Sequence, residues 1–231
     1  MPAPEIAIVI PAHNEVRALP LVLAEIPRDL EPRVIVVDNA STDGTAALAR
    51  SAGAEVVEEP RPGYGSACLA GLRHLETSPP QIVVILDGDH SDYPEDLPLL
   101  VEPILRDEAD MVCGSRVELA AAGALPPQVR WGNTLATSLI RALFGFRYRD
   151  MGPFRALRWS ALQRLEMADP AFGWNAEMQV KALQRGLRVI EVPVRYRERT
   201  GTSKISGTLR GTLGAGWGII GTILRLRFAR Q

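Results

Sequence analysis

Asp87 and Asp89 are separated by a single glycine and follow directly after the apolar, mostly β-branched run 82–86. Such a run is typical of a strand buried on both faces of a parallel sheet, and ligands of open parallel sheets bind beyond the carboxyl ends of the strands. Carboxylate oxygens suit Mg²⁺ or Mn²⁺, which keep coordination positions for the oxygens of a diphosphate. The two acids are therefore a candidate metal site, and solvated acids at a strand end are the alternative.

The elements that must position these acids follow an alternating order. Apolar runs alternate with stretches of helical pattern, which predicts an α/β fold with a mostly parallel, Rossmann-like sheet flanked by helices. The predicted strands cover residues 6–10, 34–37, 54–57, 82–86, 111–115, 154–159 and 187–196. The first strand lacks the Gly-x-Gly-x-x-Gly turn of dinucleotide-binding enzymes, and the sequence has no Walker-type loop. A nucleotide is therefore expected to be held by carboxylates and a metal.

Three of the predicted strands run directly into polar loops, at 11–15, 38–43 and 87–92. Because the carboxyl ends of parallel strands lie at the same edge of a sheet, these loops are expected to form one site. Asp38 ends a buried strand, so an unpaired acid there favours a ligand contact. Glu15 fits either a ligand contact or the acidic first turn of a helix.

Composition limits the class of protein. With 231 residues, 46% hydrophobic and 23% charged, the chain is expected to fold rather than to be disordered. The net charge of −1 gives no reason to expect nucleic acid as a partner. The two cysteines form no metal or redox motif, and the first residues lack the pattern of a signal peptide. A cytoplasmic location is expected.

Several motifs together resemble a known family. The segments 11–15 (Pro-Ala-His-Asn-Glu) and 37–45, together with Asp87-Gly88-Asp89, resemble family 2 glycosyltransferases with the GT-A fold. Three later segments are similar to those of the branch of polyprenyl (dolichyl) phosphate hexosyltransferases: 114–116, 150–155 and 199–204. Members of this branch move a hexose from a nucleotide sugar to a lipid phosphate.

The resemblance implies roles for particular residues. It implies a nucleotide-binding pocket formed by Pro11, Ala12, Glu15, Asp38, Gly88 and Arg130. It implies a Mg²⁺ or Mn²⁺ ion held by Asp87 and Asp89 on the donor diphosphate, and catalytic roles for Asp89, Arg155 and Lys204. Arg116 is a further catalytic candidate and, with Arg130, is expected to assist at the diphosphate, because guanidinium groups suit phosphate oxygens. It places the acceptor phosphate at Arg199, Ser203 and Lys204. For Arg130, a solvated helix face is the alternative.

The chain departs from the branch at two points. Ser91 stands where the branch often has Gln, which leaves the third metal ligand open. The sequence Gly152-Pro153-Phe154-Arg155 replaces the Ser-Gly-Phe-Arg of the mannosyl enzymes. This difference favours a UDP-hexose such as UDP-glucose over GDP-mannose as the donor.

The C-terminal part is basic and contains the uncharged stretch 211–224. That stretch is shorter than the roughly 20 apolar residues that a spanning helix needs. We expect a GT-A domain over 1–206, with a nucleotide-sugar half at 1–115 and an acceptor half at 116–206, followed by an amphipathic helix at 207–231. This helix either lies at a lipid interface, peripheral at the inner face of the membrane, or packs on the domain.

The sequence thus predicts an inverting, metal-dependent hexosyltransferase acting on a polyprenyl phosphate; inversion is implied by the resemblance alone. One alternative is a GT-A glycosyltransferase that acts on a saccharide or lipid hydroxyl in cell-surface glycan synthesis. Another is a nucleotide-sugar-binding protein without turnover. The sequence leaves open whether the protein forms a homo-oligomer.

Overall fold

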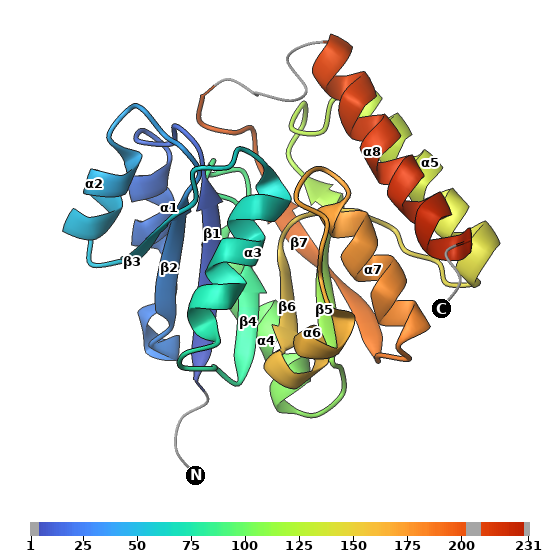
Figure 1. Cartoon of the computed structure of the whole chain (residues 1–231), viewed down its shortest axis with the longest axis horizontal. Helices are drawn as coiled ribbons and strands as arrows, with labels where there is room; N and C mark the ends of the chain where they lie inside the picture. Colours follow the sequence, from blue (N-terminus) through green and yellow to red (C-terminus); the bar gives the residue numbers. More distant parts are fainter. Residues whose placement is uncertain (1–4, 202–208, 229–231) are drawn as a thin grey trace.

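The computed structural model describes residues 5–201 and 209–228. The described chain forms one seven-stranded sheet in the order β3-β2-β1-β4-β6-β5-β7 (Figure 1). The strands are β1 (Ile6–Ala12), β2 (Arg33–Asp38), β3 (Glu55–Glu58), β4 (Ile82–Ile85), β5 (Met111–Ala120), β6 (Arg155–Arg158) and β7 (Val189–Tyr196). β6 runs antiparallel to β4 and β5, whereas the neighbours β1 and β2, β2 and β3, β1 and β4, and β5 and β7 are parallel.

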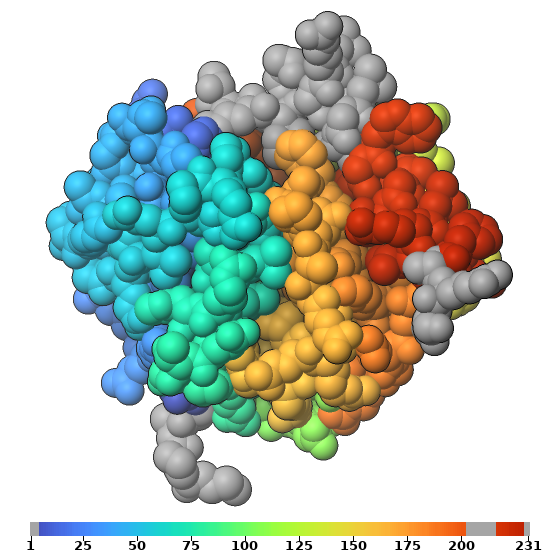
Figure 2. All heavy atoms as spheres, in the orientation of Figure 1, coloured from blue at the N-terminus to red at the C-terminus, as the bar shows by residue number. Residues whose placement is uncertain are grey.

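Helices cover both faces of the sheet. The α-helices are α1 (Leu19–Glu25), α2 (Thr45–Ser51), α3 (Tyr64–Leu75), α4 (Leu97–Leu105), α5 (Pro127–Phe144), α6 (Trp159–Leu165), α7 (Trp174–Gln184) and α8 (Leu209–Phe228). Two short 3₁₀ helices are η1 (Arg28–Leu30) and η2 (Pro94–Asp96). Figure 2 shows the face of the molecule on which α3, α6 and α8 lie, and Figure 1 shows the sheet behind α3 and α6.

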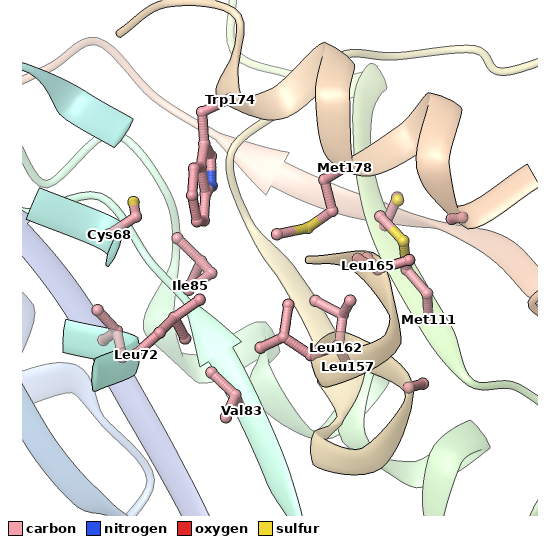
Figure 3. Close-up of a cluster of buried hydrophobic side chains, with 14 of the residues drawn as sticks. Cys68, Leu72, Val83, Ile85, Met111, Leu157, Leu162, Leu165, Trp174 and Met178 are labelled. Atoms are coloured by element: carbon pink, nitrogen blue, oxygen red, sulfur yellow. The ribbon is translucent and has the colours of Figure 1, made fainter. Parts of the chain in front are cut away.

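The alternation of side chains along the strands creates two cores. Ala7 and Val9 of β1 face the core beneath α3, α6 and α7, whereas Ile8 and Ile10 face the core beneath α1, α2 and α4. Figure 3 shows the first core, in which Trp174 of α7 packs near Ile85 of β4. Successive side chains of a strand point to opposite faces, so the continuous apolar runs of the sequence fit a sheet covered on both sides.

The structure corrects several predicted boundaries. β5 continues through Ala120, beyond the predicted end at 115, because its last residues pair with β7 after a register shift between Ser115 and Leu119. The predicted strand over 154–159 is shorter, and Trp159 instead begins α6, which the sequence analysis did not predict.

α8 packs against α5 and α7 (Figure 1). Ile223 and Thr222 are buried in this contact, whereas Trp217 is 78% exposed and Phe228 is 72% exposed. The helix therefore has one face that packs on the domain and aromatic side chains that do not. Within the described residues, no helix has both the length and the apolar character needed to cross a membrane.

Candidate active site at the carboxyl ends of the strands

The ends of β1, β2 and β4 meet at one edge of the sheet. Ala12 pairs with Asp38, and the amide of Asn39 donates to the carbonyl oxygen of Ala12. The loop after β4 approaches β1 so closely that a Cβ atom at Gly88 would lie 3.3 Å from the carbonyl oxygen of Pro11. The structure thus brings together Pro11, Ala12, Asp38, Asp87 and Gly88, as the sequence predicted.

Asp38 is buried, and its Oδ1 atom has no hydrogen-bond partner within the described chain. Its neighbour Asn39 shapes the loop that follows β3: the amide group donates to the carbonyl oxygens of Glu59 (3.0 Å) and Arg61 (2.7 Å). The Oδ1 atom of Asn39 accepts from the amide of Gly63 at 2.9 Å. Asn39 lies within the segment 37–45, but its three contacts join residues 20 to 24 positions apart, so no local pattern predicts this role.

Glu15 lines a cavity of about 230 Å³ between the loop after β1 and the segment after β7. Arg17 lies on the first side of this cavity, and Thr200 and Gly201 lie on the other. The amide of Glu15 donates to the hydroxyl of Thr45 at 2.9 Å, which fixes this loop to the start of α2. The cavity places the candidate nucleoside contact Glu15 next to residues 197–201, a segment after β7 that contains Arg197 and Arg199 and is called the basic segment below.

Asp87 and Asp89 differ in their surroundings. The Oδ1 atom of Asp87 is buried without a hydrogen-bond partner in the described chain. Burial, with a smaller contribution from the charge of Asp89, raises the pKa of Asp87 to about 7. The Oδ1 atom of Asp89 accepts from the amide and hydroxyl of Ser91, and its Oδ2 atom lies 3.0 Å from a guanidinium nitrogen of Arg199. Ser91 therefore orients Asp89.

This donor set fits a divalent cation. Two closely spaced carboxylates, one with an unpartnered buried oxygen, supply the hard oxygen ligands that Mg²⁺ and Mn²⁺ prefer. Among residues 5–201 and 209–228, no group of three or more His, Cys, Asp or Glu side chains is arranged to hold a metal ion. An ion at Asp87 and Asp89 would thus need further oxygens, such as those of a diphosphate.

Asp92 is a further acid of this loop that the sequence analysis did not single out. Its side chain is buried, and neither carboxylate oxygen has a hydrogen-bond partner in the described chain. Burial and the nearby charge of Asp87 raise its pKa well above the usual value. The only sequence signal is a third acid five residues after Asp87, and nothing in that spacing shows that it is buried.

The guanidinium of Arg116 is held by Asp150. Its Nε atom lies 2.7 Å from Oδ2 of Asp150, a terminal nitrogen lies 2.8 Å from Oδ1, and the two side chains are almost fully buried. The Tyr196 ring lies 4.9 Å from the guanidinium carbon of Arg116. Two guanidinium nitrogens of Arg116 are thus already paired with Asp150. A contact between Arg116 and a donor diphosphate stays a prediction.

Arg155 begins β6 and is fully buried. Its guanidinium donates to the carbonyl oxygens of Gly152, Pro153 and Asn175. It also pairs along the sheet with Ile85, two residues before Asp87. The structure thus places a buried cation beside the strand that carries the candidate metal ligands.

The remaining four predicted site residues fall into three cases. Arg130 is exposed on α5, and its Nε atom donates to the carbonyl oxygen of Leu125. This local contact fits the solvated helix face. Ser203 and Lys204 lie outside the described residues, so their predicted roles stay predictions. Arg199, in contrast, reaches the loop after β4 through Asp89.

Comparison with known proteins identifies the class to which this fold and site belong. Residues 7–165 match the family described as glycosyl transferase family 2. This match covers more than half of the chain, so the protein belongs to family 2 of the glycosyltransferases.

Particular relatives are similar over most of the chain. An uncharacterised glycosyltransferase of Mycobacterium tuberculosis is 41% identical over 209 residues, covering 90% of this chain and 93% of the relative. An undecaprenyl-phosphate mannosyltransferase of Micrococcus luteus is 33% identical over 217 residues, covering 88% of each chain. The predicted resemblance to polyprenyl-phosphate glycosyltransferases is thereby confirmed.

A solved structure shows the same fold. Glucosyl-3-phosphoglycerate synthase of Mycobacterium tuberculosis, crystallised with Mn²⁺, UDP-glucose and phosphoglyceric acid, superposes with a TM-score of 0.77 at 25% identity. The match covers 99% of this chain and 81% of that chain. The predicted GT-A fold, with its mostly parallel sheet and C-terminal helix, is confirmed.

Proposed function

We propose that this glycosyltransferase moves a hexose, with inversion, from a nucleotide sugar to a polyprenyl phosphate in a metal-dependent reaction. The observation that carries the proposal is the contact between Asp89 and Arg199. It joins the candidate metal ligands to the basic segment 197–201, at the edge of the sheet where β1, β2 and β4 end. A donor diphosphate and an acceptor phosphate would both bind at this junction.

The donor would bind with its nucleoside at Asp38 and Glu15 and its diphosphate near Asp87 and Asp89. The buried, unpartnered oxygen of Asp38 can accept a hydrogen bond from a base or a ribose hydroxyl. A UDP-hexose such as UDP-glucose is favoured over GDP-mannose by the Gly152-Pro153 sequence. The related glucosyl-3-phosphoglycerate synthase was crystallised with UDP-glucose, which supports this choice.

Asp87 and Asp89 would hold Mg²⁺ or Mn²⁺, and the bound ion would neutralise charge on the departing nucleoside diphosphate. Arg155 would add to the positive potential behind this loop from its buried position. Arg116 would contribute through its charge while Asp150 fixes its orientation. In this proposal, the two cations would lie near the place where negative charge grows as the bond between the sugar and the diphosphate breaks.

The acceptor would be a lipid phosphate bound by Arg199, Ser203 and Lys204. One of its phosphate oxygens would form the new bond to the anomeric carbon, on the face opposite the departing diphosphate. A phosphate is already ionised near neutral pH, so this attack needs no strong general base. The relative from Micrococcus luteus is named for a lipid phosphate of this kind, which supports the assignment.

The protein would bind peripherally to the inner face of the membrane through its C-terminal helix, assigned to residues 207–231 after the GT-A domain 1–206, on the side of α8 that does not pack on α5 and α7. Trp217 and Phe228 of α8 are strongly exposed, as is Trp131 of α5, the helix that packs beside it. Arg225 and Arg227 lie in the last turn of α8. Exposed aromatic side chains beside basic residues are typical of helices at a lipid interface.

Thermal stabilisation by nucleotides tests the donor half of this proposal. UDP with Mn²⁺ should raise the melting temperature more than UDP alone, and more than GDP with Mn²⁺, because a ligand that binds only the folded state stabilises it. Stabilisation by GDP and not by UDP would overturn the choice of donor. A response to neither nucleotide, with or without Mn²⁺, would contradict nucleotide-sugar binding at this edge.

A further inference from the structure

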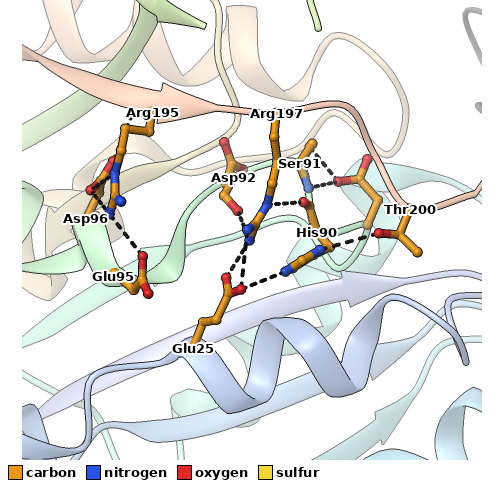
Figure 4. Close-up of polar contacts among 10 residues, drawn as sticks. Glu25, His90, Ser91, Asp92, Glu95, Asp96, Arg195, Arg197 and Thr200 are labelled. Atoms are coloured by element: carbon orange, nitrogen blue, oxygen red, sulfur yellow. Dashed lines mark hydrogen bonds and ion pairs between the residues drawn. The ribbon is translucent and has the colours of Figure 1, made fainter. Parts of the chain in front are cut away.

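We propose that Glu25, the last residue of α1, is a positioning residue that fixes the basic segment 197–201 against the loop 87–92. It would act through Arg197 and His90, without touching the donor or the acceptor. This inference rests on the proposed function and deepens it, because it assigns the spacing between the two phosphate sites to a contact outside both. Figure 4 shows Glu25 facing Arg197 and His90 from the neighbouring helix.

One guanidinium joins three parts of the chain. Arg197, just after β7, pairs with both carboxylate oxygens of Glu25 through its two terminal nitrogens. Its Nε atom donates to the carbonyl oxygen of His90 at 2.8 Å, and a terminal nitrogen donates to that of Asp92 at 3.3 Å. The planar fork of arginine is suited to such simultaneous contacts, whereas a lysine ammonium is not. Arg197 thus ties α1 to the loop that carries the candidate metal ligands.

His90 provides the second connection. One ring nitrogen lies 2.9 Å from Oε1 of Glu25, and the other lies 3.3 Å from the hydroxyl of Thr200. Its backbone has a φ angle of +63°, a conformation that is uncommon outside glycine. Glu25 therefore contacts Arg197, the first residue of the basic segment, and also His90, which contacts Thr200 near the other end of the segment.

Backbone hydrogen bonds complete the attachment. The amide of Arg197 donates to the carbonyl oxygen of Ser91, and the amide of Thr200 donates to that of Asp89, both at 2.9 Å. Between these two bonds lies Arg199, whose guanidinium reaches Asp89. A shift of the segment would therefore displace Arg199 relative to the candidate metal ligands.

Tyr93 limits the position of Arg197 from another side. The guanidinium carbon of Arg197 lies 4.1 Å from the centre of the Tyr93 ring, and that of Arg195 lies 4.4 Å from it. Arg195 is itself paired with Glu95 and Asp96. The stacking restrains the plane of the Arg197 guanidinium, while the Glu25 carboxylate supplies its charged partner.

The charge of Glu25 is matched to this role. Burial alone would raise the pKa of Glu25, but hydrogen bonds from Arg197 and His90 outweigh burial and lower it. The carboxylate is therefore ionised at neutral pH. Replacing it by an amide keeps the size of the side chain but removes the charge that pairs with Arg197. The segment would then stay attached by its backbone bonds and lose its restraint toward α1.

The decisive experiment compares Glu25→Gln with Glu95→Gln. Glu95 is the matched control, because it pairs with an arginine at the same end of β7 but has no contact with His90 or Arg197 among those described. The rates of hexose transfer to polyprenyl phosphate and of donor hydrolysis to free sugar are measured for each purified variant, together with UDP binding in EDTA. Loss of a charged hydrogen bond changes a rate or affinity by about tenfold or more.

We expect Glu25→Gln to lower the ratio of transfer to hydrolysis by about tenfold, because a displaced segment admits water and misplaces the acceptor. UDP binding in EDTA should stay unchanged, and Glu95→Gln should behave as wild type in all three measurements. Arg197→Lys, which keeps the charge but not the fork, should also lower the ratio. A role in folding alone would lower the melting temperature without changing this ratio.

The outcomes separate this inference from the proposed function. If wild type transfers hexose and Glu25→Gln and Arg197→Lys keep the wild-type ratio, Glu25 has no positioning role. An equal loss in Glu95→Gln would also overturn the inference, because the effect would then belong to any ion pair of this surface. If wild type itself shows neither transfer nor nucleotide binding, the proposed function fails and the inference with it.

Discussion

Residues 1–115, the proposed donor half, and residues 116–206, the proposed acceptor half, differ in whether their buried charged side chains have partners. In the proposed donor half, Asp38 and Asp92 are buried and Asp87 is half-buried, and each has at least one buried carboxylate oxygen without a hydrogen-bond partner in the described chain. In the proposed acceptor half, largely buried charged side chains are matched within the half: Arg116 with Asp150, and Lys181 with Glu177. Burying an unpaired carboxylate is costly, so unpaired groups persist where a ligand compensates them. We infer that the unpaired carboxylates of the proposed donor half are available to ligands, whereas the paired charges of the proposed acceptor half stabilise the fold.

The largest effect is expected when a candidate metal ligand is neutralised. Asp89→Asn should lower turnover by about a thousandfold or more, because a bound metal contributes several kcal/mol of charge stabilisation to the transition state. The melting temperature without ligand should change little, since asparagine keeps the size of the side chain and an Oδ1 atom that can accept from Ser91, and the Arg199 partner is 35% exposed and can turn to solvent. Steady-state kinetics and thermal unfolding measure the two effects. Full wild-type activity in EDTA would disprove the metal assignment.

The second change addresses a matched pair of the acceptor half. Asp150→Asn should reduce the free energy of unfolding by about 3–5 kcal/mol, because it leaves the buried charge of Arg116 without its partner. Urea denaturation measures this value. A loss below about 1 kcal/mol would show that the pair is not a structural element of this half.

The same pair predicts a dependence on pH. Burial would raise the pKa of Asp150, but the charge and hydrogen bonds of Arg116 outweigh burial and lower it. The stabilising contribution is therefore complete above the unfolded pKa of about 4 and is lost as the pH falls through the folded value. Below about pH 4, the stability of wild type should fall more steeply than that of Asp150→Asn. If the free energies of unfolding of wild type and Asp150→Asn fall in parallel as the pH is lowered, Asp150 does not contribute to this pH dependence.

The third change tests whether Asp38 of the proposed donor half contacts the nucleoside. Asp38→Ala should weaken UDP binding by about ten- to a hundredfold, whether or not metal is present, because it removes a charged hydrogen-bond acceptor for the nucleoside. Isothermal titration with and without Mn²⁺ measures the effect. An unchanged dissociation constant would assign Asp38 to the fold alone.

The fourth change probes the contact between the halves. A Cβ atom at Gly65 of α3 would lie 2.0 Å from the carbonyl oxygen of Asp169, so Gly65→Ala should destabilise the protein by about 1–3 kcal/mol. Gly132 of α5 is the matched control, because a Cβ atom there meets nothing within 4 Å. Gly132→Ala should be neutral or stabilise by up to about 1 kcal/mol. If urea denaturation gives the same change in the free energy of unfolding for Gly65→Ala and Gly132→Ala, the backbone at Asp169 moves aside without loss of stability.

The donor half could be predicted from the sequence because its evidence is local. Apolar runs that end in acids identified the strands and the positions of Asp38, Asp87 and Asp89, and the parallel register then placed them together. The buried state of Asp92 and the contacts of Asn39 depend on tertiary packing, which local spacing does not encode.

The acceptor half was harder to predict because its contacts join distant parts of the chain. Arg116 and Asp150 are 34 positions apart, and Glu25 and Arg197 are 172 positions apart. The sequence therefore favoured a phosphate role for Arg116 and showed no link between Glu25 and the basic segment. The end of β5 was misplaced for the same reason, since pairing with β7 extends it.

Transfer to paired acceptors tests the central claim most directly. Purified protein is given UDP-glucose, Mn²⁺ and either a polyprenyl phosphate or the corresponding polyprenyl alcohol, and glycosylated lipid is quantified by mass spectrometry. The account predicts product from the phosphate and little or none from the alcohol, because the basic segment has no charge to pair with in the alcohol. Equal rates with both lipids would contradict the lipid-phosphate assignment.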